Sequence, residues 1–207
     1  ENTVIKVQDN ETGKVFETKI DTPIEVVGYP VKNIKPVKLD LDLKYDFNFL
    51  TVGTWIPRKN MGNTIRWFVE EFYDQDVGLI VKTSLMKNCL QDRIAMQNTL
   101  KNILAEYKDR KCEVNLLHGD LSEEEMAGLY NHPKVKAFVS LSHGEGFGLP
   151  LFEAVYNELP VIAPDWSGHT DFLHMPEKKN SKKLKPMFSS VSYDINPVQK
   201  DAVWPGV

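Results

Sequence analysis

The chain has 207 residues, of which 42% are hydrophobic and 26% charged, a composition typical of a globular protein with a sizeable core. The net charge of −4 argues against a nucleic-acid partner and confines any phosphate site to a local cluster. With two cysteines, no visible signal peptide and no apolar run of membrane-spanning length, we expect a reduced, cytoplasmic setting. Because the chain starts at Glu1 and ends in DAVWPGV, we expect a fragment of a longer protein.

The first 46 residues differ in character from the rest. Two β-prone runs around a glycine-containing turn predict a β-hairpin over residues 4–20. Residues 31–46 are rich in Lys, Asp and Pro without a clear period, which is typical of a linker. The DLD triplet at 40–42 has the spelling of a metal-binding motif, but its place in this segment favours surface charge. We therefore expect a boundary between residues 1–46 and a domain at 47–207 that is cut short at its C-terminus.

From residue 47 onward, strand-like and helix-like segments alternate. The strand-like runs are FNFLTVG, VGLIVKT, EVNLLHG, VKAFVSLS and LPVIAP, with a last strand predicted in KPMFSSVSYDI. Helical patterns cover residues 61–73, 90–108 and 122–132, and another helix opens at Pro150. Ser122 and Glu125 have the spacing of a capping box, which marks a helix start. This alternation predicts an α/β fold, a parallel sheet with right-handed crossovers.

Five of the strand-like runs lead into turns that carry small or polar residues. These turns are VGTWIPRKN, VKTS, LHGD, SHGEGFG and APDWSG. In a parallel sheet the carboxyl ends of the strands share one edge, where ligands bind. The sequence therefore places a binding site at this edge.

The segment GEGFGLP leads a bare backbone into a helix. Glycines allow positive φ and close approach of a ligand, and Pro150 suits the first helical turn, where its missing N–H costs nothing. Free N–H groups and the helix dipole favour an anion such as a diphosphate at this end. The segment is neither a P-loop nor a G-x-G-x-x-G motif, and both are absent from the chain.

Glu145 and Glu153 flank this loop, with seven residues between them. Taken singly, the first is a solvated loop acid and the second an acid that favours the helix dipole. Together these interpretations fit poorly, because a carboxylate facing a phosphate would repel it. Carboxylates accept hydrogen bonds from hydroxyl groups well. The pair therefore predicts a ribose on one side of a diphosphate and a transferred sugar on the other.

The segment EGFGLPLFEAVYNELPVIAPDWSG resembles the E-x7-E motif of retaining glycosyltransferases of family four, also called group-one transferases. VGTWIPRKNMGNTI is similar to the first strand and phosphate loop of that family. VNLLHGDLSEEEMAGLYNHPKVKAFVSLS is similar to a third family segment. One difference lies before the fifth strand, where NELP stands in place of the frequent CGTP. The resemblance covers roughly residues 24–175 and excludes the hairpin.

The resemblance implies one half of a GT-B fold, in which two Rossmann-like domains enclose the substrates. Residues 47–207 would be the C-terminal, Rossmann-like donor domain with helices on both faces of its sheet, and the acceptor domain would be missing. A nucleotide sugar such as a UDP- or GDP-hexose would be the substrate, with no cofactor or metal. The acceptor, whether glycan, lipid or protein, stays open.

The resemblance also assigns roles to residues of the loop. Glu153 would hold the ribose, and Glu145 would hold the transferred sugar. The remaining donor contacts would come from the backbone of Gly146, Phe147 and Gly148 and from the amides around Leu149 and Leu151. Retention in this family is attributed to front-face attack assisted by the leaving phosphate.

At the first strand, Lys59 matches the lysine that neutralises the leaving diphosphate, and Arg58 precedes it. Many relatives have an arginine directly after the glycine of this strand, whereas Thr54 follows Gly53 here. Either Arg58 substitutes for that arginine or phosphate binding is weaker. On its own, PRKN is simply a basic turn.

The histidines are loop residues first, because no pair has the spacing of a helical metal site. His169 lies at the exit of the fifth strand and is the first candidate among them to contact the donor. His118 and Gly119 are expected to border the base.

Two other functions stay open. A related enzyme, such as a sugar-nucleotide epimerase or a phosphorylase relative, is one, although a phosphorylase would need a pyridoxal-bearing lysine motif that is not evident. The other is a donor-binding module without catalytic activity.

Overall fold

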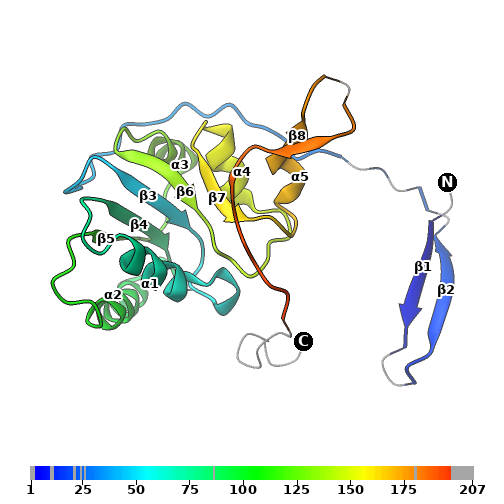
Figure 1. The fold of residues 1–207 in the computed structure, drawn as a ribbon, viewed down its shortest axis with the longest axis horizontal. Helices are drawn as coiled ribbons and strands as arrows, with labels where there is room; N and C mark the ends of the chain where they lie inside the picture. The colour runs from blue at the N-terminus through cyan, green and yellow to red at the C-terminus, as the bar shows by residue number, and fades with distance from the viewer. Residues whose placement is uncertain are drawn as a thin grey trace. The chain divides into compact units, whose positions relative to one another are not determined.

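The computed structural model describes residues 3–9, 12–20, 22–23, 25, 27–85, 87–179 and 181–196 (Figure 1). The chain divides into two compact units, residues 1–33 and residues 34–207. Each unit is described by itself below.

The N-terminal unit contains the predicted β-hairpin. Strands β1 (Thr3–Gln8) and β2 (Val15–Ile20) pair antiparallel, with Gln8 opposite Val15 at the turn end. Gly13 has φ +68° in the connecting turn, and its amide donates to the Asp9 carbonyl. The predicted β-hairpin is confirmed.

The second unit is built on a six-stranded sheet with the order β10-β7-β6-β3-β4-β5, in which every described pairing is parallel. Its strands are β3 (Asn48–Val52), β4 (Gly78–Thr83), β5 (Glu113–His118), β6 (Val135–Val139), β7 (Val161–Pro164) and β10 (Ser189–Val191). The order places β3 in the interior of the sheet, beside β6. The predicted parallel sheet is confirmed, and β10 lies within the predicted last strand.

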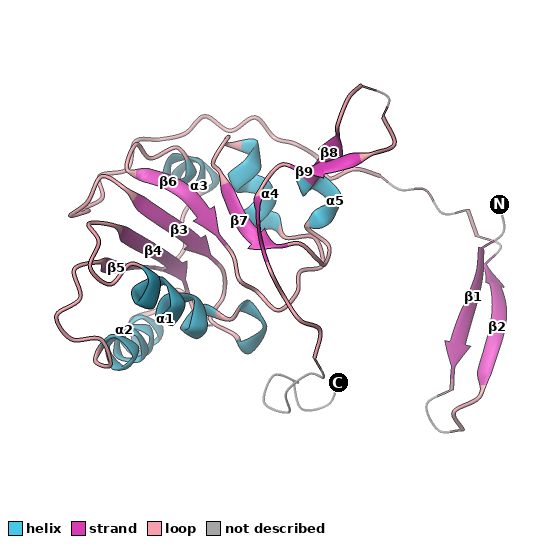
Figure 2. Ribbon diagram, viewed as in Figure 1, coloured by secondary structure: helices cyan, strands magenta, loops and turns pink. Residues whose placement is uncertain are grey.

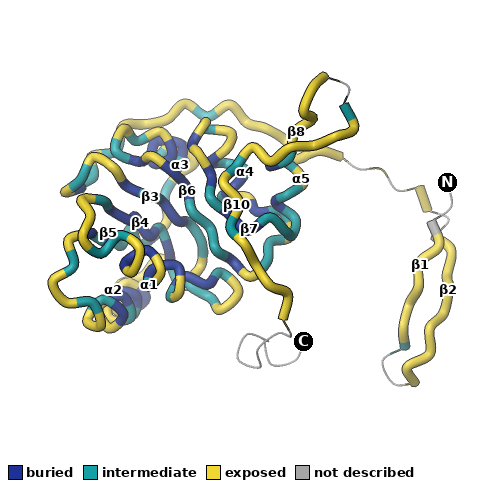
Figure 3. Tube along the Cα trace, viewed as in Figure 1, coloured by how far each residue is buried: buried dark blue, intermediate teal, exposed yellow. Residues whose placement is uncertain are grey.

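Helices cover both faces of this sheet (Figure 2). Helices α1 (Met61–Glu71) and α2 (Leu90–Leu104) lie on one face, and α3 (Glu123–Tyr130), α4 (Leu149–Tyr156) and α5 (Thr170–Leu173) on the other. Alternation along β4 explains both contacts, because successive side chains of a strand point to opposite faces. Leu79 and Val81 pack with α1 and α2, whereas Ile80 packs with α3 and α4. Figure 3 shows the buried residues along the central strands.

The structure places the division between units earlier than the predicted boundary at residue 46. Residues 34–46 belong to the second unit, where Leu43 is buried in the core and Leu39 and Leu41 pack against it. The Val37 amide donates to the Glu124 carbonyl at the start of α3. This segment is therefore part of the domain, and its alternating leucines are the physical reason. The intervening Asp40 and Asp42 are exposed, as expected for surface charge.

One feature near the end of the domain was not predicted. Strands β8 (His174–Pro176) and β9 (Leu184–Pro186) form a small antiparallel ribbon that the sequence pattern did not indicate. Cys89 and Cys112 are both free.

Candidate active site at the carboxyl edge of the sheet

Lys59 and Arg58 follow β3 on the short helix η1 (Pro57–Lys59), at the carboxyl edge of the sheet. Asn60 ends η1 in the left-handed conformation, with φ +53°. Its side-chain amide donates to the Leu141 carbonyl at 3.0 Å, and the His143 amide donates to the Arg58 carbonyl at 2.8 Å. The turn after β3 is thus bonded to the loop after β6.

The Lys59 side chain passes close to the backbone of Gly53. A Cβ atom at Gly53 would lie 3.4 Å from Lys59 Cδ and 3.0 Å from the Met61 side chain, so the glycine keeps this path open. Thr54 is exposed at the same exit. Thr54 brings no positive charge to this exit, and whether Arg58 substitutes for the missing arginine in phosphate binding stays open.

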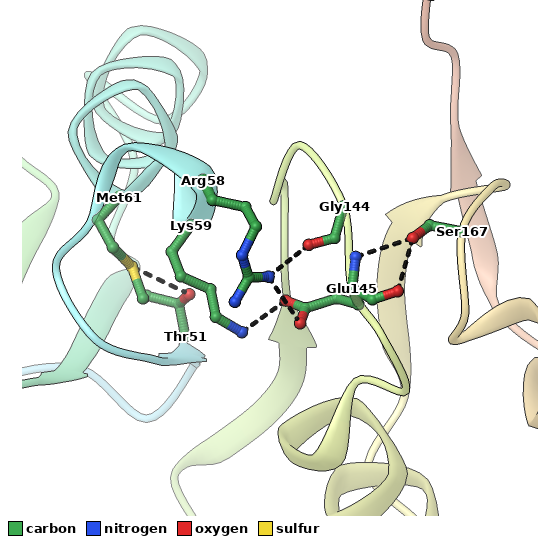
Figure 4. A network of polar contacts seen from close by, with 7 residues as sticks. All are labelled: Thr51, Arg58, Lys59, Met61, Gly144, Glu145 and Ser167. Carbon is green, nitrogen blue, oxygen red and sulfur yellow. Dashed lines mark hydrogen bonds and ion pairs between the residues drawn. The ribbon is translucent and has the colours of Figure 1, made fainter. Parts of the chain in front are cut away.

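Glu145 forms ion pairs with both Lys59 and Arg58, as Figure 4 shows. Its Oε1 lies 2.6 Å from Lys59 Nζ, and its Oε2 lies 3.2 Å from Arg58, whose guanidinium also donates to the Gly144 carbonyl. The Glu145 side chain is 6% exposed, that of Lys59 13% and that of Arg58 48%. Burial by itself would raise the pKa of the Glu145 carboxyl, but the hydrogen bond and charge of Lys59, with smaller contributions from Ser142 and Arg58, hold this pKa below its ordinary value. Glu145 is therefore ionised at neutral pH.

Ser167 and Gly168, which were not predicted as site residues, fix the backbone of Glu145. Ser167 Oγ accepts from the Glu145 amide and donates to the Glu145 carbonyl, both at 2.8 Å. The Gly168 amide donates to the same carbonyl at 3.0 Å. Ser167 has φ +78°, an uncommon conformation for a residue other than glycine. Such strained backbone is often found at functional sites, and the sequence alone does not reveal it.

The loop then enters α4 through Gly148, which has φ +89°. A Cβ atom there would lie 2.9 Å from that of His169, so only glycine fits without displacing a neighbour. Pro150 lies in the first turn of α4, and the amides of Leu149 and Leu151 are among those that a helix leaves without an internal partner. The Leu151 side chain, by contrast, is in the core.

The Phe147 side chain packs with aromatic neighbours. Its ring centroid lies 5.4 Å from that of Phe152 on α4 and 5.0 Å from that of Phe172 on α5. These contacts anchor the loop to two helices. Gly146 is exposed, and contact of a donor with the backbone of Gly146, Phe147 and Gly148 stays a prediction.

Glu153 lies one turn into α4, and it is tied to α3 rather than to the cations. Its Oε2 accepts a hydrogen bond from the buried Tyr130 hydroxyl at 2.9 Å. Burial raises the pKa of the Glu153 carboxyl and the nearby Glu123 raises it further, while the bond from Tyr130 lowers it in part. Burial and the charge of Glu153 raise the pKa of Tyr130 well above its ordinary value, so this hydroxyl stays a donor.

The two predicted histidines have buried side chains. His118 lies 3.2 Å from Asp92, which also accepts the backbone amides of Leu85 and Lys87. His169 is 1% exposed and its ring bonds to the Pro164 carbonyl at 2.8 Å. The contact of His169 with the donor stays a prediction, and in this structure its ring is buried and bonds to the end of β7.

Gly119 follows β5 with φ +105°, and a Cβ atom there would lie 2.8 Å from Asn88 Oδ1. The Lys82 side chain donates to the Gly119 carbonyl, and burial lowers the pKa of this lysine. This turn is thus a second fixed part of the same sheet edge. Its predicted contact with the base stays a prediction.

The described part of the chain contains neither a cluster of metal-ligating side chains nor a helix that could span a membrane. Across residues 3–196, apart from the gaps in the description, no three His, Cys, Asp or Glu side chains gather as metal ligands. Within the same residues, no helix has the length and hydropathy that crossing a bilayer requires.

An α/β domain with two cations, a buried carboxylate and a helix N-terminus at one sheet edge is a candidate anion-binding domain of the nucleotide-sugar type. Comparison with known proteins identifies the family. Residues 49–181 match the family described as Glycosyl transferases group 1, which is more than half of the chain. The chain therefore belongs to the group 1 glycosyltransferases.

The serotype-specific mannosyltransferase WbdA of Escherichia coli is 31% identical over 121 residues, which cover 57% of this chain. The chain spans only 13% of the length of that relative.

Two solved structures share the fold. One is the sucrose-phosphate synthase of Thermosynechococcus elongatus, with a TM-score of 0.51 and 23% identity over 68% of this chain and 34% of that protein. The other is described as trehalose-6-phosphate from E. coli bound with UDP-2-fluoro glucose. It has a TM-score of 0.51 and 11% identity over 64% of this chain and 32% of that one.

Proposed function

We propose that this domain binds a nucleoside diphosphate sugar and that, within the longer enzyme, the sugar is transferred to an acceptor with retention and without a metal ion. The observation that carries the proposal is the meeting of Lys59, Arg58 and Glu145 at the carboxyl edge of the sheet, beside the start of α4. Family membership supports a transferase over an epimerase or a module that only binds.

In this proposal the diphosphate binds at the two cations and at the N-terminus of α4. Cleavage of the sugar–phosphate bond develops negative charge on the leaving oxygen, which fixed cations and helix N–H groups stabilise. These groups supply the positive charge that a metal would otherwise provide. Lys59 should contribute most to stabilising the leaving oxygen, because its side chain is mostly shielded from solvent.

The two acids of the loop would then hold the neutral ends of the donor. Glu153 accepts the ribose hydroxyls and Glu145 those of the transferred sugar, because carboxylates accept and do not donate. The donor is a UDP- or GDP-hexose. Mannose is the first sugar to test, since the relative WbdA is named a mannosyltransferase.

The acceptor would be held by a second domain of the longer protein. Transfer requires an acceptor oriented at the anomeric carbon and water kept away from it, and one sheet edge does not enclose a substrate. We place this chemistry in the cytoplasm, the reducing setting that suits two free cysteines.

Isothermal titration calorimetry tests the proposal. UDP-, GDP- and ADP-sugars are titrated into the 207-residue chain, with and without EDTA, and one series should bind equally well in both conditions. Lys59→Ala should abolish that binding, whereas Lys111→Ala, which removes an exposed lysine paired with Asp76, should not. Absence of binding by every sugar nucleotide refutes the donor-domain assignment, and loss of binding on chelation refutes metal independence.

A further inference from the structure

The cations that would bind the diphosphate are already paired with a carboxylate of the protein. Glu145 contacts Lys59 through one oxygen and Arg58 through the other. An incoming diphosphate must therefore compete with Glu145 for both groups. We propose that this competition makes the site selective for the intact sugar nucleotide over the free nucleoside diphosphate, an inference that rests on the proposed function.

Glu145 cannot escape the competition by moving away. Its backbone is held by Ser167 Oγ at both its amide and its carbonyl, and by the Gly168 amide. Its side chain is 6% exposed, so little water is available to solvate the carboxylate if the cations leave it. A buried charge that loses its partner is strongly unfavourable. Glu145 therefore needs a replacement partner whenever the cations turn to a ligand.

A sugar nucleotide supplies that partner, and a free nucleoside diphosphate does not. The hydroxyl groups of the sugar can donate to the carboxylate lone pairs while Lys59 and Arg58 contact the diphosphate. With the free diphosphate, the carboxylate and the phosphate share the same two cations at close range. Two like charges then face each other in a poorly solvated place, where their repulsion is only weakly screened.

This selectivity has a consequence for turnover. Before transfer, the sugar hydroxyls hold Glu145 and leave the cations to the diphosphate. After transfer, the hydroxyls depart with the product, and Glu145 returns to the cations in competition with the remaining nucleoside diphosphate. Glu145 therefore weakens the binding of this product and speeds its release, which is a rate-limiting step in many enzymes.

Calorimetry with GDP, UDP and the sugar nucleotide identified by the panel tests the inference on three proteins. In Glu145→Gln, which removes the charge and keeps the shape, free nucleoside diphosphate should bind about tenfold more tightly than in the wild type. The sugar nucleotide should gain nothing or bind more weakly. Glu106→Gln is the matched control, because it removes the same charge from a half-exposed glutamate paired with Arg66 and should leave both affinities unchanged.

Two more variants keep the test decisive if Glu145→Gln folds poorly. Glu145→Asp retains the charge and should keep the weak binding of free diphosphate. Glu145→Ala removes the charge by another substitution and should show the same gain in the binding of free nucleoside diphosphate. If Glu145→Gln binds the free nucleoside diphosphate no more tightly than the wild type does, the inference is overturned. The proposed function still stands in that case, provided that the wild type binds the sugar nucleotide. If the wild type binds neither ligand, the proposed function itself fails.

Discussion

Gly168→Ala is expected to displace the loop that carries Glu145. A Cβ atom at Gly168 would lie 1.9 Å from the Gly146 carbonyl oxygen and 2.8 Å from that of Glu145, whereas real Cβ contacts essentially never fall below 3.0 Å. The difference of 3.0 − 1.9 = 1.1 Å is the least distance by which the backbone must part. Both obstacles are backbone atoms, so no side chain can rotate to relieve the clash.

This displacement should lower both the stability of the protein and its activity. Overpacking of this kind typically destabilises a protein by about 1–3 kcal/mol. Misplacement of a catalytic group by about 1 Å can lower activity by roughly a hundredfold. Because the Gly168 amide also bonds to the Glu145 carbonyl, we expect both effects, with Glu145 moved away from Lys59.

Gly146→Ala is the matched comparison, since the two glycines touch each other. No heavy atom lies within 4 Å of a Cβ placed at Gly146, so this variant should unfold at the same urea concentration as the wild type. Urea denaturation followed by circular dichroism measures the first effect, and calorimetry with the sugar nucleotide measures the second. A Gly168→Ala protein with wild-type stability and donor affinity would refute the idea that this close contact sets the loop position.

Three further predictions concern the charged residues of the site. Lys59→Ala should lower transfer by the full-length enzyme by about a hundredfold or more in an assay with labelled donor, because the leaving diphosphate loses its most shielded cation; unchanged transfer would exclude this role. Glu153→Gln should weaken the calorimetric binding of free nucleotide, which carries a ribose but no transferred sugar, whereas Glu145→Gln should not; equal losses would show that the acids do not divide the donor in this way. The pKa of Glu153 is raised above 4.5, so the folded protein binds this proton more tightly than the unfolded chain does. The contribution of Glu153 to stability therefore falls as pH rises from the unfolded pKa through the folded pKa. Melting temperatures from pH 4 to pH 7 should therefore decline less for Glu153→Gln than for the wild type, and parallel curves would contradict the assignment.

The alternation of strands and helices was predictable because each run carries its own period. The runs that became β3, β4 and β5 are short, apolar and bounded by turns, and the capping box at Ser122 is present as predicted. The segment at 34–46 was missed for a local reason. Its leucines alternate with charged residues over a length too short to outweigh the Lys and Pro around them, and their burial depends on packing against the core of the folded domain.

The pairing inside the site lies beyond local sequence. Lys59 and Glu145 are 86 residues apart, and they meet because β6 lies beside β3 in the sheet, an order that no single segment encodes. The resemblance named both residues but gave no reason for them to touch. Ser167 was missed because a serine in a turn has no period, and its positive φ and its two hydrogen bonds to the Glu145 backbone appear only in three dimensions.

The two acids of the motif face opposite electrostatic conditions, which separates what each does for the fold from what it does for a ligand. Glu145 has a lowered pKa because Lys59, Ser142 and Arg58 together outweigh its burial. Its charge therefore supports folding above the ordinary carboxyl range, and that support is lost as pH falls through the folded pKa. Glu153 has a raised pKa because burial and Glu123 outweigh the one bond from Tyr130, so its charge opposes folding at neutral pH. A glutamine could accept the same hydrogen bond without that cost. The proposed function gives a reason to keep this half-buried carboxylate, because it can accept hydrogen bonds from hydroxyl groups such as those of a ribose.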